Sequence, residues 1–566
     1  MKRIDATLIA VLLFLGAARV WVTPEFAADL PQDAADFVNP ALNLLERGKL
    51  ISVVSNNTGA EIAMGHPIGL PLLLAPVYWL TGHFPGNGIY LIQLLYLATL
   101  ILVYVAGTRL AGRVGGAVAA VFLIANHGAA LYATKIMSEG PATFALMALY
   151  VLAAREKGFL SSAGIALAAG AVAGLAIVIR YDNVLFFAPL VVIAFLQRES
   201  FRWRGVALFV VGALPFLAGQ AAYNARYYGS ATRVGYQYAG NAGTEACPMF
   251  TWRNALTESY LAMRPELNVA FTNLAEGNLI LYAKTVVSEA DSTLPFSGDP
   301  RWRDKPKALY QKFVLARFAL ALTGFVLCFV APGAGRHRVF LRVWLSVLVP
   351  VMIGFYAFYF WQEERFFLRL VPWQCLLTGV TVAEVVRWLR ARPPVPRWAG
   401  TASVAAAAIG LAGAFWAFTV TRSVIATAGN PFVYEAMTCA DEMIEPDAIV
   451  VTNFDPVRTY TYLSRLKPRL VLQLGDEDDY GYVPVPGQIQ YMNGDSVLKE
   501  PRHLVDLLRH RRPAYFLNKY VGISVPPPEL VELSKAFELE AVTNSCRNLR
   551  VPFLYRITGD TVLLID

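Results

Sequence analysis

Residues 87–133 read NGIYLIQLLYLATLILVYVAGTRLAGRVGGAVAAVFLIANHGAALYA, and the pattern of this stretch recurs along most of the chain. Two apolar runs, 87–108 and 114–133, flank the short basic sequence RLAGR at 109–113. Each run has the length of about 20 residues that an α-helix needs to cross the roughly 30 Å hydrocarbon core of a bilayer. The stretch therefore predicts two membrane-spanning helices joined by a short basic loop.

The composition of the whole chain also indicates a membrane protein. Of its 566 residues, 56% are hydrophobic and only 16% are charged, whereas about a quarter of a typical soluble domain is charged. The net charge of +8 does not require a nucleic-acid partner, because the basic residues gather in short loops between apolar runs. We expect a polytopic α-helical protein that lies in a lipid bilayer and binds no nucleic acid.

The apolar runs predict about eleven spans, at 6–23, 87–108, 114–133, 140–154, 161–179, 184–197, 205–222, 313–331, 341–360, 366–386 and 399–420. If the N-terminus is cytoplasmic, alternation places inside the loops 109–113, 154–158, 197–204, 335–342 and 387–398, all rich in Arg or Lys. This distribution obeys the positive-inside rule, and ten or twelve spans would violate it. We predict a multi-pass protein of the inner (cytoplasmic) membrane with its C-terminus in the periplasm.

Two domains are expected. Residues 1–420 form the transmembrane domain, with outer loops at 24–86 and 223–312, and residues 421–566 form a soluble extracytoplasmic α/β domain. Alternating patterns in the second domain predict strands at DAIVVTNF, RLVLQLG, PAYFLNKY and TVLLID, and helices at PRHLVDLLRH and PELVELSKAF. It has no Gly-rich phosphate loop, which favours packing or acceptor docking over catalysis. Its cysteines, Cys439 and Cys546, could pair in an oxidising compartment.

The predicted outer loops and turns carry most of the notable acids. The segment DLPQDAADF contains Asp29, which reads as a helix-start residue, followed by Asp33 and Asp36. Four further candidates lie in later outer segments: His66, Glu139, Arg180 and Arg365. Any one of these side chains could be a solvated loop residue or an interface anchor. Charged groups close to a bilayer are costly, however, and tend to be functional or paired, so their recurrence at so many outer turns favours a functional site.

Several motifs, taken in order, carry a family resemblance. DAADF has an acid at Asp33 and an aromatic residue at Phe37, and it is followed by GHPIGLPLL, SEGPATFALMALYVLAAR, IRYDNVLFFAPLVV, YNARYYGS and ERFFLRLVP. This series resembles the GT-C superfamily of integral-membrane glycosyltransferases, in the branch of protein O-mannosyltransferases and aminoarabinose transferases. The resemblance covers roughly residues 1–380. Two positions depart from it, because Ala34 replaces a second acid and His66 replaces a lysine.

The resemblance implies a polyprenyl-phosphate monosaccharide as donor and an acceptor that bears a hydroxyl group. A hydroxyl is a poor nucleophile, so a carboxylate must take its proton, and Asp33 is the expected base with Asp36 as a possible helper. Arg365 is the leading candidate to bind the phosphate of the leaving lipid, with His66 and Arg180 as further candidates. Glu139 would orient the acceptor or sugar. No cofactor is implied, although Glu139 with Asp33 could hold a divalent metal.

Other classes of function stay open from the sequence. A lipid-linked sugar transporter would carry its polar residues in broken helices at mid-membrane, whereas the acids here fall at outer turns. A polysaccharide polymerase or ligase also acts outside and uses Arg-rich loops, but the early acidic loop argues against it. A non-catalytic scaffold would not need the outer acids. The family's oligosaccharyltransferase motif, Trp-Trp-Asp-Tyr-Gly, does not occur in the chain.

Overall fold

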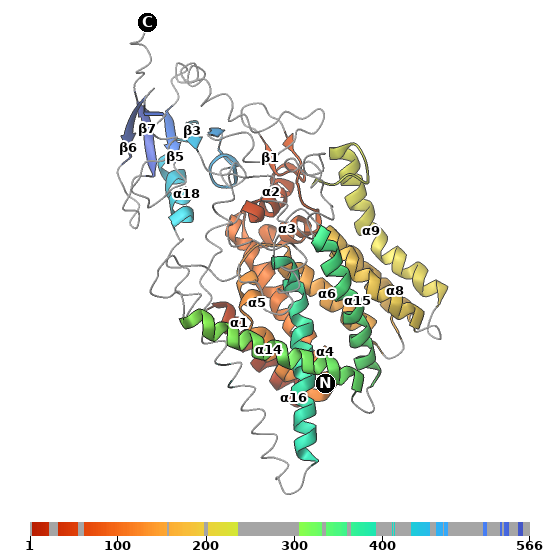
Figure 1. Cartoon of the computed structure of the whole chain (residues 1–566). Helices are drawn as coiled ribbons and strands as arrows, with labels where there is room; N and C mark the ends of the chain where they lie inside the picture. Colours follow the sequence, from red (N-terminus) through yellow and green to blue (C-terminus); the bar gives the residue numbers. More distant parts are fainter. Residues whose placement is uncertain are drawn as a thin grey trace. The chain divides into compact units, whose positions relative to one another are not determined.

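The structure is a computed structural model, and its elements are drawn in Figure 1. It describes residues 3–21, 32–54, 61–155, 158–196, 202–235, 305–330, 335–358, 364–391, 410, 413, 432–452, 460–467, 469–473, 513–517, 533–534, 537–542 and 553–558. Contacts divide the chain into two compact units. Unit 1 comprises Met1–Pro24, Ile89–Ala222 and Thr244–Ala426, and unit 2 comprises Glu25–Gly88, Tyr223–Gly243 and Thr427–Asp566.

Unit 1 is built from apolar helices. In chain order the elements that contribute to it are α1 (Arg3–Trp21), α4 (Ile89–Ala125), α5 (His127–Tyr132), α6 (Glu139–Ala153), α7 (Ala163–Ile179), η3 (Tyr181–Phe186), α8 (Phe187–Leu196), α9 (Trp203–Tyr228), α14 (Lys305–Val330), α15 (Arg336–Phe358), η9 (Glu364–Leu370) and α16 (Val371–Arg390). Four helical stretches in the described residues are long and apolar enough to cross a membrane: Pro85–Ala125, Trp203–Tyr228, Arg336–Phe358 and Phe366–Arg390. Shorter apolar helices accompany them.

The predicted helical membrane fold is confirmed, although the number of spans is not. Helices occur at ten of the eleven predicted spans, and nearly all of the last, 399–420, lies outside the described residues. The predicted span 87–108 and most of the predicted span 114–133 form one long element, α4, which is interrupted at Gly112, where φ is 77°. Glycine has no Cβ and adopts this backbone conformation readily. The break lies within the predicted basic loop 109–113.

One predicted span is wrong in its continuity. The run 114–133 was expected to form one helix, but the chain breaks at Asn126. The Asn126 side chain accepts a 2.8 Å hydrogen bond from the amide of Ala129 and so caps a separate short helix, α5. An asparagine at this position stabilises a new helix start in preference to an uninterrupted helix.

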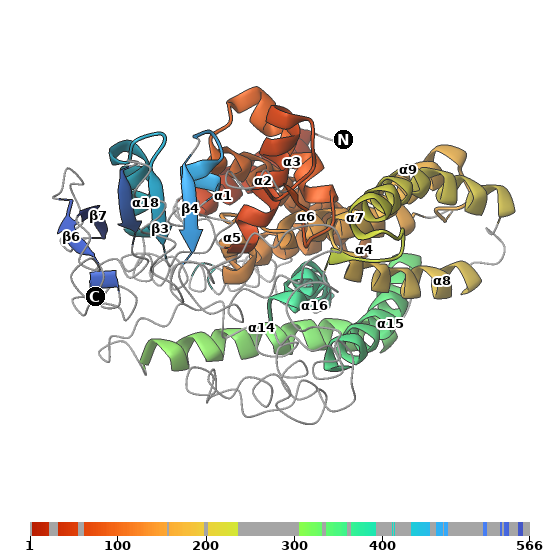
Figure 2. The same cartoon turned by 90° about the horizontal axis from the view of Figure 1, so that it is seen from above.

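Close helix packing holds unit 1 together. α16 contacts both α4 and α14, and α6 contacts both α4 and α7 (Figures 1 and 2). Rings from three helices meet in the core, because Tyr150 of α6 lies edge-on to Trp344 of α15 at 5.3 Å and to Trp373 of α16 at 6.1 Å. Where α7 approaches α9, a Cβ at Gly170 would lie only 1.9 Å from the carbonyl oxygen of Phe209. Small residues allow such backbone contacts between membrane helices.

Unit 2 combines the segment Glu25–Gly88 and the short segment Tyr223–Gly243 with the C-terminal part of the chain. The segment 25–88 contains α2 (Gln32–Arg47), the short antiparallel pair β1 (Val53–Val54) and β2 (Glu61–Ile62), α3 (Gly69–Thr81) and η2 (Pro85–Gly88). The C-terminal part contains α18 (Phe432–Met443), the π-helix η10 (Tyr460–Ser464) and a five-stranded sheet. Unit 2 therefore groups stretches that lie far apart in the sequence.

The sheet confirms the predicted C-terminal α/β character. Its strands are β3 (Ile449–Thr452), β4 (Leu470–Gln473), β5 (Ala514–Leu517), β6 (Glu538–Ala541) and β7 (Leu554–Thr558), in the order β4-β3-β5-β7-β6. β4, β3 and β5 are parallel, and β7 and β6 continue the sheet antiparallel, as Figure 1 shows for β5, β7 and β6. Sequence patterns predict β3, β4 and β5 but miss β6 and β7. The predicted strand TVLLID and helix PRHLVDLLRH lie outside the described residues, as does most of PELVELSKAF.

The domain boundary at 420 and the Cys439–Cys546 pairing stay predictions. Cys439 does form a disulfide, but the residue to which it is bonded lies outside the described residues.

Candidate functional site

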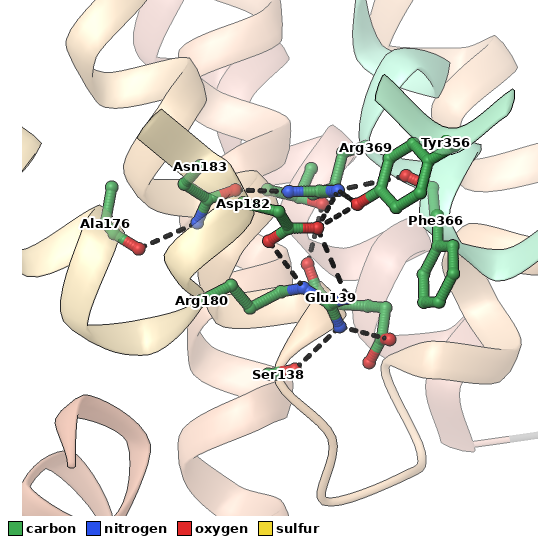
Figure 3. Close-up of polar contacts among 10 residues, drawn as sticks. Ser138, Glu139, Ala176, Arg180, Asp182, Asn183, Tyr356, Phe366 and Arg369 are labelled. Carbon is green, nitrogen blue, oxygen red and sulfur yellow. Dashed lines mark hydrogen bonds and ion pairs between the residues drawn. The ribbon is translucent and has the colours of Figure 1, made fainter. Parts of the chain in front are cut away.

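Two groups of polar residues, one in each unit, contain four of the six predicted site residues: Asp36, His66, Glu139 and Arg180. The group in unit 1, which we call the arginine cluster, consists of Ser138, Glu139, Arg180, Asp182, Asn183, Tyr356 and Arg369 (Figure 3). The group in unit 2, which we call the acid–histidine group, consists of Asp36, Ser52, Met64, His66, Tyr223 and Tyr228.

The local sequence IRYDN shapes the first part of the arginine cluster. α7 ends at Ile179, and Arg180 takes an extended conformation while its amide still bonds to the carbonyl of Ala176. The buried Asn183 side chain donates a 2.8 Å hydrogen bond to that same carbonyl. Carbonyls in the last turn of a helix lack partners within the helix, so Asn183 stabilises this end. The turn between α7 and α8 is thereby fixed with Arg180 and Asp182 side by side.

Arg180 joins the two carboxylates of the cluster. Its Nε donates to Asp182 Oδ1 at 3.2 Å, and its Nη1 donates to Glu139 Oε1 at 2.7 Å and to Ser138 Oγ at 3.0 Å (Figure 3). Glu139 is the first residue of α6, where a negative charge also interacts favourably with the helix dipole. The structure therefore brings together Glu139 and Arg180, two residues that were predicted from separate motifs.

Arg369 completes the cluster from η9, and its side chain is fully buried. Its Nη2 donates to Asp182 Oδ2 at 2.7 Å and to the Tyr356 hydroxyl at 2.6 Å, and its Nη1 donates to Asn183 Oδ1 (Figure 3). The Tyr356 hydroxyl in turn donates to Asp182 Oδ2. Since burial of an unpaired charge is very costly, this network balances two guanidinium groups against two carboxylates.

The electrostatics of the cluster favour the ionised form of Asp182, which lies in the turn between α7 and α8. Burial by itself would raise the pKa of this carboxyl group. The guanidinium groups of Arg180 and Arg369 and the hydrogen bond from Tyr356 outweigh burial and hold the pKa well below its usual range. Asp182 is thus a stable counter-ion in the folded protein rather than a group that exchanges protons near neutral pH.

A small cavity of about 40 Å³ adjoins the cluster, and Glu139 lines it. Its other polar lining residues are Tyr96, Thr99, Tyr132 and Thr143, and Leu368 and Pro372 lie on its apolar side. A water needs roughly 10–15 Å³ of such volume, so the cavity holds only a few waters in this conformation. Most of the lining is apolar, and the hydroxyls of Thr99 and Thr143 donate to the backbone carbonyls of Leu95 and Glu139, so the cavity is a small space beside Glu139 and does not by itself define a polar subsite.

The acid–histidine group in unit 2 joins α2 to the loop after β2. His66 Nε2 lies 3.7 Å from Asp36 Oδ2, and the His66 ring lies against the Phe37 ring with centroids 4.7 Å apart. The Ser52 hydroxyl donates to Asp36 Oδ1 at 3.3 Å. Ala34, which replaces an acid of the family pattern, is fully buried.

The loop that carries His66 is held by the YNARYYGS motif at the end of α9. The hydroxyl of Tyr223 accepts a 2.9 Å hydrogen bond from the amide of Met64, and the hydroxyl of Tyr228 donates to the Met64 carbonyl. Further along, a Cβ at Gly235 would lie 2.4 Å from the carbonyl oxygen of Gly65. This motif therefore supports the position of His66 rather than presenting a reactive group of its own.

Two predicted residues are placed only by their backbone. Asp33 lies in the first turn of α2 and Arg365 lies in η9, but the side chains of both are outside the described residues. Their predicted roles stay predictions. Sequence reasoning missed Arg369, Tyr356 and Asn183 as members of the cluster, although Arg369 belongs to the same ERFFLRLVP motif as Arg365. Among the residues described, no three His, Cys, Asp or Glu side chains form a group that could hold a metal ion.

Comparison with known proteins identifies the fold. The chain has the fold of GT-C integral-membrane glycosyltransferases. In particular, it superposes on the crystal structure of ArnT from Cupriavidus metallidurans with a TM-score of 0.58 and 12% identity, over 98% of this chain and 97% of that one. The structure of the same ArnT bound to undecaprenyl phosphate gives the same score and identity over 99% of both chains.

A second solved structure shares the fold. The archaeal oligosaccharyltransferase AglB from Archaeoglobus fulgidus, in complex with an inhibitory peptide and a dolichol-phosphate, has a TM-score of 0.51 and 10% identity, over 100% of this chain and 75% of that one. No protein-family model matches the sequence, and no curated protein matches it significantly. At these low identities the likeness establishes the fold alone.

Proposed function

We propose that the protein is an inverting glycosyltransferase that moves a monosaccharide from a polyprenyl-phosphate donor to an acceptor hydroxyl on a lipid, glycan or protein. The observation that carries the proposal is the pairing of predicted residues. Asp36 and His66 lie 3.7 Å apart, and Glu139 and Arg180 lie 2.7 Å apart, although each pair comes from motifs well separated in the sequence. The ArnT fold supports the same class of donor, because one ArnT structure holds undecaprenyl phosphate.

In the proposed reaction the acceptor oxygen attacks the anomeric carbon as the bond from that carbon to the donor phosphate oxygen breaks. The hydroxyl proton passes to the Asp33 carboxylate, and the bonding electrons leave with polyprenyl phosphate. Arg365 and His66 stabilise the negative charge that develops on the phosphate, with Arg180 as a further phosphate-binding residue. Asp36 helps Asp33 at the acceptor side. Attack from the side opposite the leaving group inverts the configuration of the sugar.

We further propose that the reaction takes place on the periplasmic face of the inner membrane. The loops rich in Arg and Lys support a cytoplasmic N-terminus, and with eleven spans the C-terminal domain is periplasmic. The candidate acids then lie on the side to which lipid-linked sugars are presented.

The test is transfer by the purified full-length protein in detergent, with a labelled polyprenyl-phosphate sugar and a panel of hydroxyl acceptors. We expect the wild-type protein to release polyprenyl phosphate. The Asp33→Asn variant should release none but should still bind the donor. Asp29→Asn is the matched control, because it makes the same change four residues earlier at the predicted helix-start residue.

Three outcomes would contradict the proposal. Near-normal turnover by Asp33→Asn would remove the assigned base. Turnover only with polyprenyl-diphosphate glycans would favour a polymerase or ligase. Movement of intact donor across a vesicle membrane without release of the sugar would favour a transporter.

A further inference from the structure

The π-helix η10 of the C-terminal part lies along α2, the helix that carries the predicted acids. Thr461 Oγ1 donates to Asn39 Oδ1 at 2.8 Å, and the Tyr460 hydroxyl donates to Asn43 Oδ1 at 2.9 Å. All four of these side chains are buried. Both contacts join residues more than 400 positions apart in the sequence, within the same compact unit.

An ion pair extends this contact by one more turn of α2. Arg465 Nη1 pairs with Glu46 Oε1, and the side chains of both are largely buried. Arg47 Nη2 donates to the carbonyl of Arg465 at 3.3 Å, and Arg465 Nη2 donates to the carbonyl of His83 at 3.3 Å. The segment 460–465 therefore contacts α2 at three successive turns.

The spacing of the contacted residues fixes the rotation of α2 about its axis. Asn39 and Asn43 are four residues apart, and Asp36 precedes Asn39 by three, so all three lie on one face of the helix. Asp33 precedes Asp36 by a further turn. Rotation of α2 would separate the amides of Asn39 and Asn43 from their hydroxyl partners and leave buried polar groups unsatisfied, which is costly.

The segment that contacts α2 is itself anchored in the C-terminal core. Leu463, within the same π-helix, packs in a hydrophobic cluster with Ile444, Val450 and Leu517. Immediately beyond, the fully buried Arg469 donates to the carbonyls of Leu463 and Glu445 at 3.2 and 2.9 Å. One face of this short segment therefore belongs to the sheet core, and its polar groups reach α2. π-helical turns are rare and are frequent at functional sites.

We infer that Tyr460, Thr461 and Arg465 are positioning residues, through which the C-terminal domain holds α2 in the rotation that presents its acids for catalysis. This inference rests on the proposed function for its catalytic consequence. It gives the C-terminal domain a role in the reaction without any group that touches the substrate. A misplacement of about 1 Å in a catalytic group can cost on the order of 100-fold in rate. A small displacement of α2 is therefore enough to lower the rate of transfer measurably.

The first measurement tests the contact itself, by hydrogen–deuterium exchange of the full-length protein. The double variant Tyr460→Phe/Thr461→Val removes both hydroxyls and keeps the shapes of the side chains. We expect faster exchange in peptides from α2 and unchanged exchange in α6. Thr452→Val is the matched control, because Thr452 also donates a buried 2.8 Å hydrogen bond, but to Leu517 within the sheet. It should leave exchange in α2 unchanged.

The second measurement separates positioning from stability, by steady-state kinetics. We expect kcat of the double variant to fall about 10- to 100-fold with little change in the donor KM, and the acidic limb of its pH profile to shift. The single variant Thr461→Ser keeps a hydroxyl at this position and should retain near-normal kcat. Thr452→Val should retain near-normal kcat even where its unfolding temperature falls as much as that of the double variant.

The outcomes separate this inference from the proposed function. Unchanged exchange in α2 of the double variant overturns the inference, and so does an equal loss of kcat in Thr452→Val and the double variant. If the wild-type protein transfers no sugar from any donor, the proposed function fails. The exchange experiment then still decides whether the C-terminal domain holds α2.

Discussion

Removal of the charge of Asp182 should destabilise the protein and change how its stability depends on pH. Asp182→Asn keeps the size of the side chain and an oxygen that can accept from Tyr356, but it deprives the fully buried Arg369 of its carboxylate. Breaking a buried ion pair costs about 3–5 kcal/mol. Arg180 keeps Glu139 as a partner, so we expect the lower end, about 3 kcal/mol. The apparent unfolding temperature at pH 7 should fall by roughly 2–5 °C.

The dependence on pH follows from the lowered pKa of Asp182. A carboxyl group whose pKa is depressed by folding contributes stability that is present above its unfolded pKa of about 3.9 and is lost as the pH falls through the folded value. The gap in unfolding temperature between wild type and Asp182→Asn should therefore be constant from pH 7 to about 5 and narrow below about pH 4.

The assay is thermal unfolding in detergent at a fixed scan rate, across this pH series. Glu61→Gln is the control, because the Lys49–Glu61 pair has side chains that are 44% and 32% exposed and should contribute less than about 1 kcal/mol. An unfolding temperature for Asp182→Asn within a degree of wild type at pH 7 would refute the reasoning, and so would a gap that persists unchanged to pH 3.

Three further predictions concern the proposed reaction. Arg365→Ala should raise the donor KM or Kd by about tenfold or more, since Arg matches phosphate geometry, and unchanged donor affinity would exclude Arg365 from the phosphate role. Tyr228→Phe removes the hydroxyl that holds the Met64 carbonyl and should lower kcat severalfold, whereas the adjacent Tyr227→Phe should not; equal effects would show that Tyr228 does not act through the His66 loop. Incubation with EDTA should leave the rate of sugar transfer unchanged, and recovery of a lost rate by added divalent metal would show that the reaction needs one.

The fold could be predicted in outline because membrane helices leave a strong local signal. A run of about 20 apolar residues identifies a span without knowledge of what it contacts, and basic loops mark the breaks. The break at Asn126 was missed because a single asparagine hardly changes the mean hydropathy of an apolar run of about 20 residues. β6 was missed because its residues alternate between exposed and half-buried, and ELEA has little β propensity.

The candidate site was predicted less completely, because its members are joined by contacts rather than by spacing. Asp36, His66, Glu139 and Arg180 stood out as polar residues at predicted outer turns, and each proved to have an acidic or basic side chain as a neighbour. Arg369 did not stand out, because it lies within an apolar stretch that was assigned to a span. The Arg369 side chain can be buried because Asp182 and Tyr356, from other helices, form hydrogen bonds with it. The sequence around Arg369 does not indicate these contacts.

The long separation between α2 and η10 has a consequence for the order in which the protein is made. Tyr460 follows Asn43 by 417 residues, which at 5–20 residues per second corresponds to roughly 20–80 s of synthesis. Throughout that interval Asn39 lacks its contact with Thr461, Asn43 its contact with Tyr460, and Glu46 its contact with Arg465. If η10 holds α2 as inferred, the helix with the predicted acids reaches its final position only after the ribosome has made the C-terminal segment, late rather than progressively.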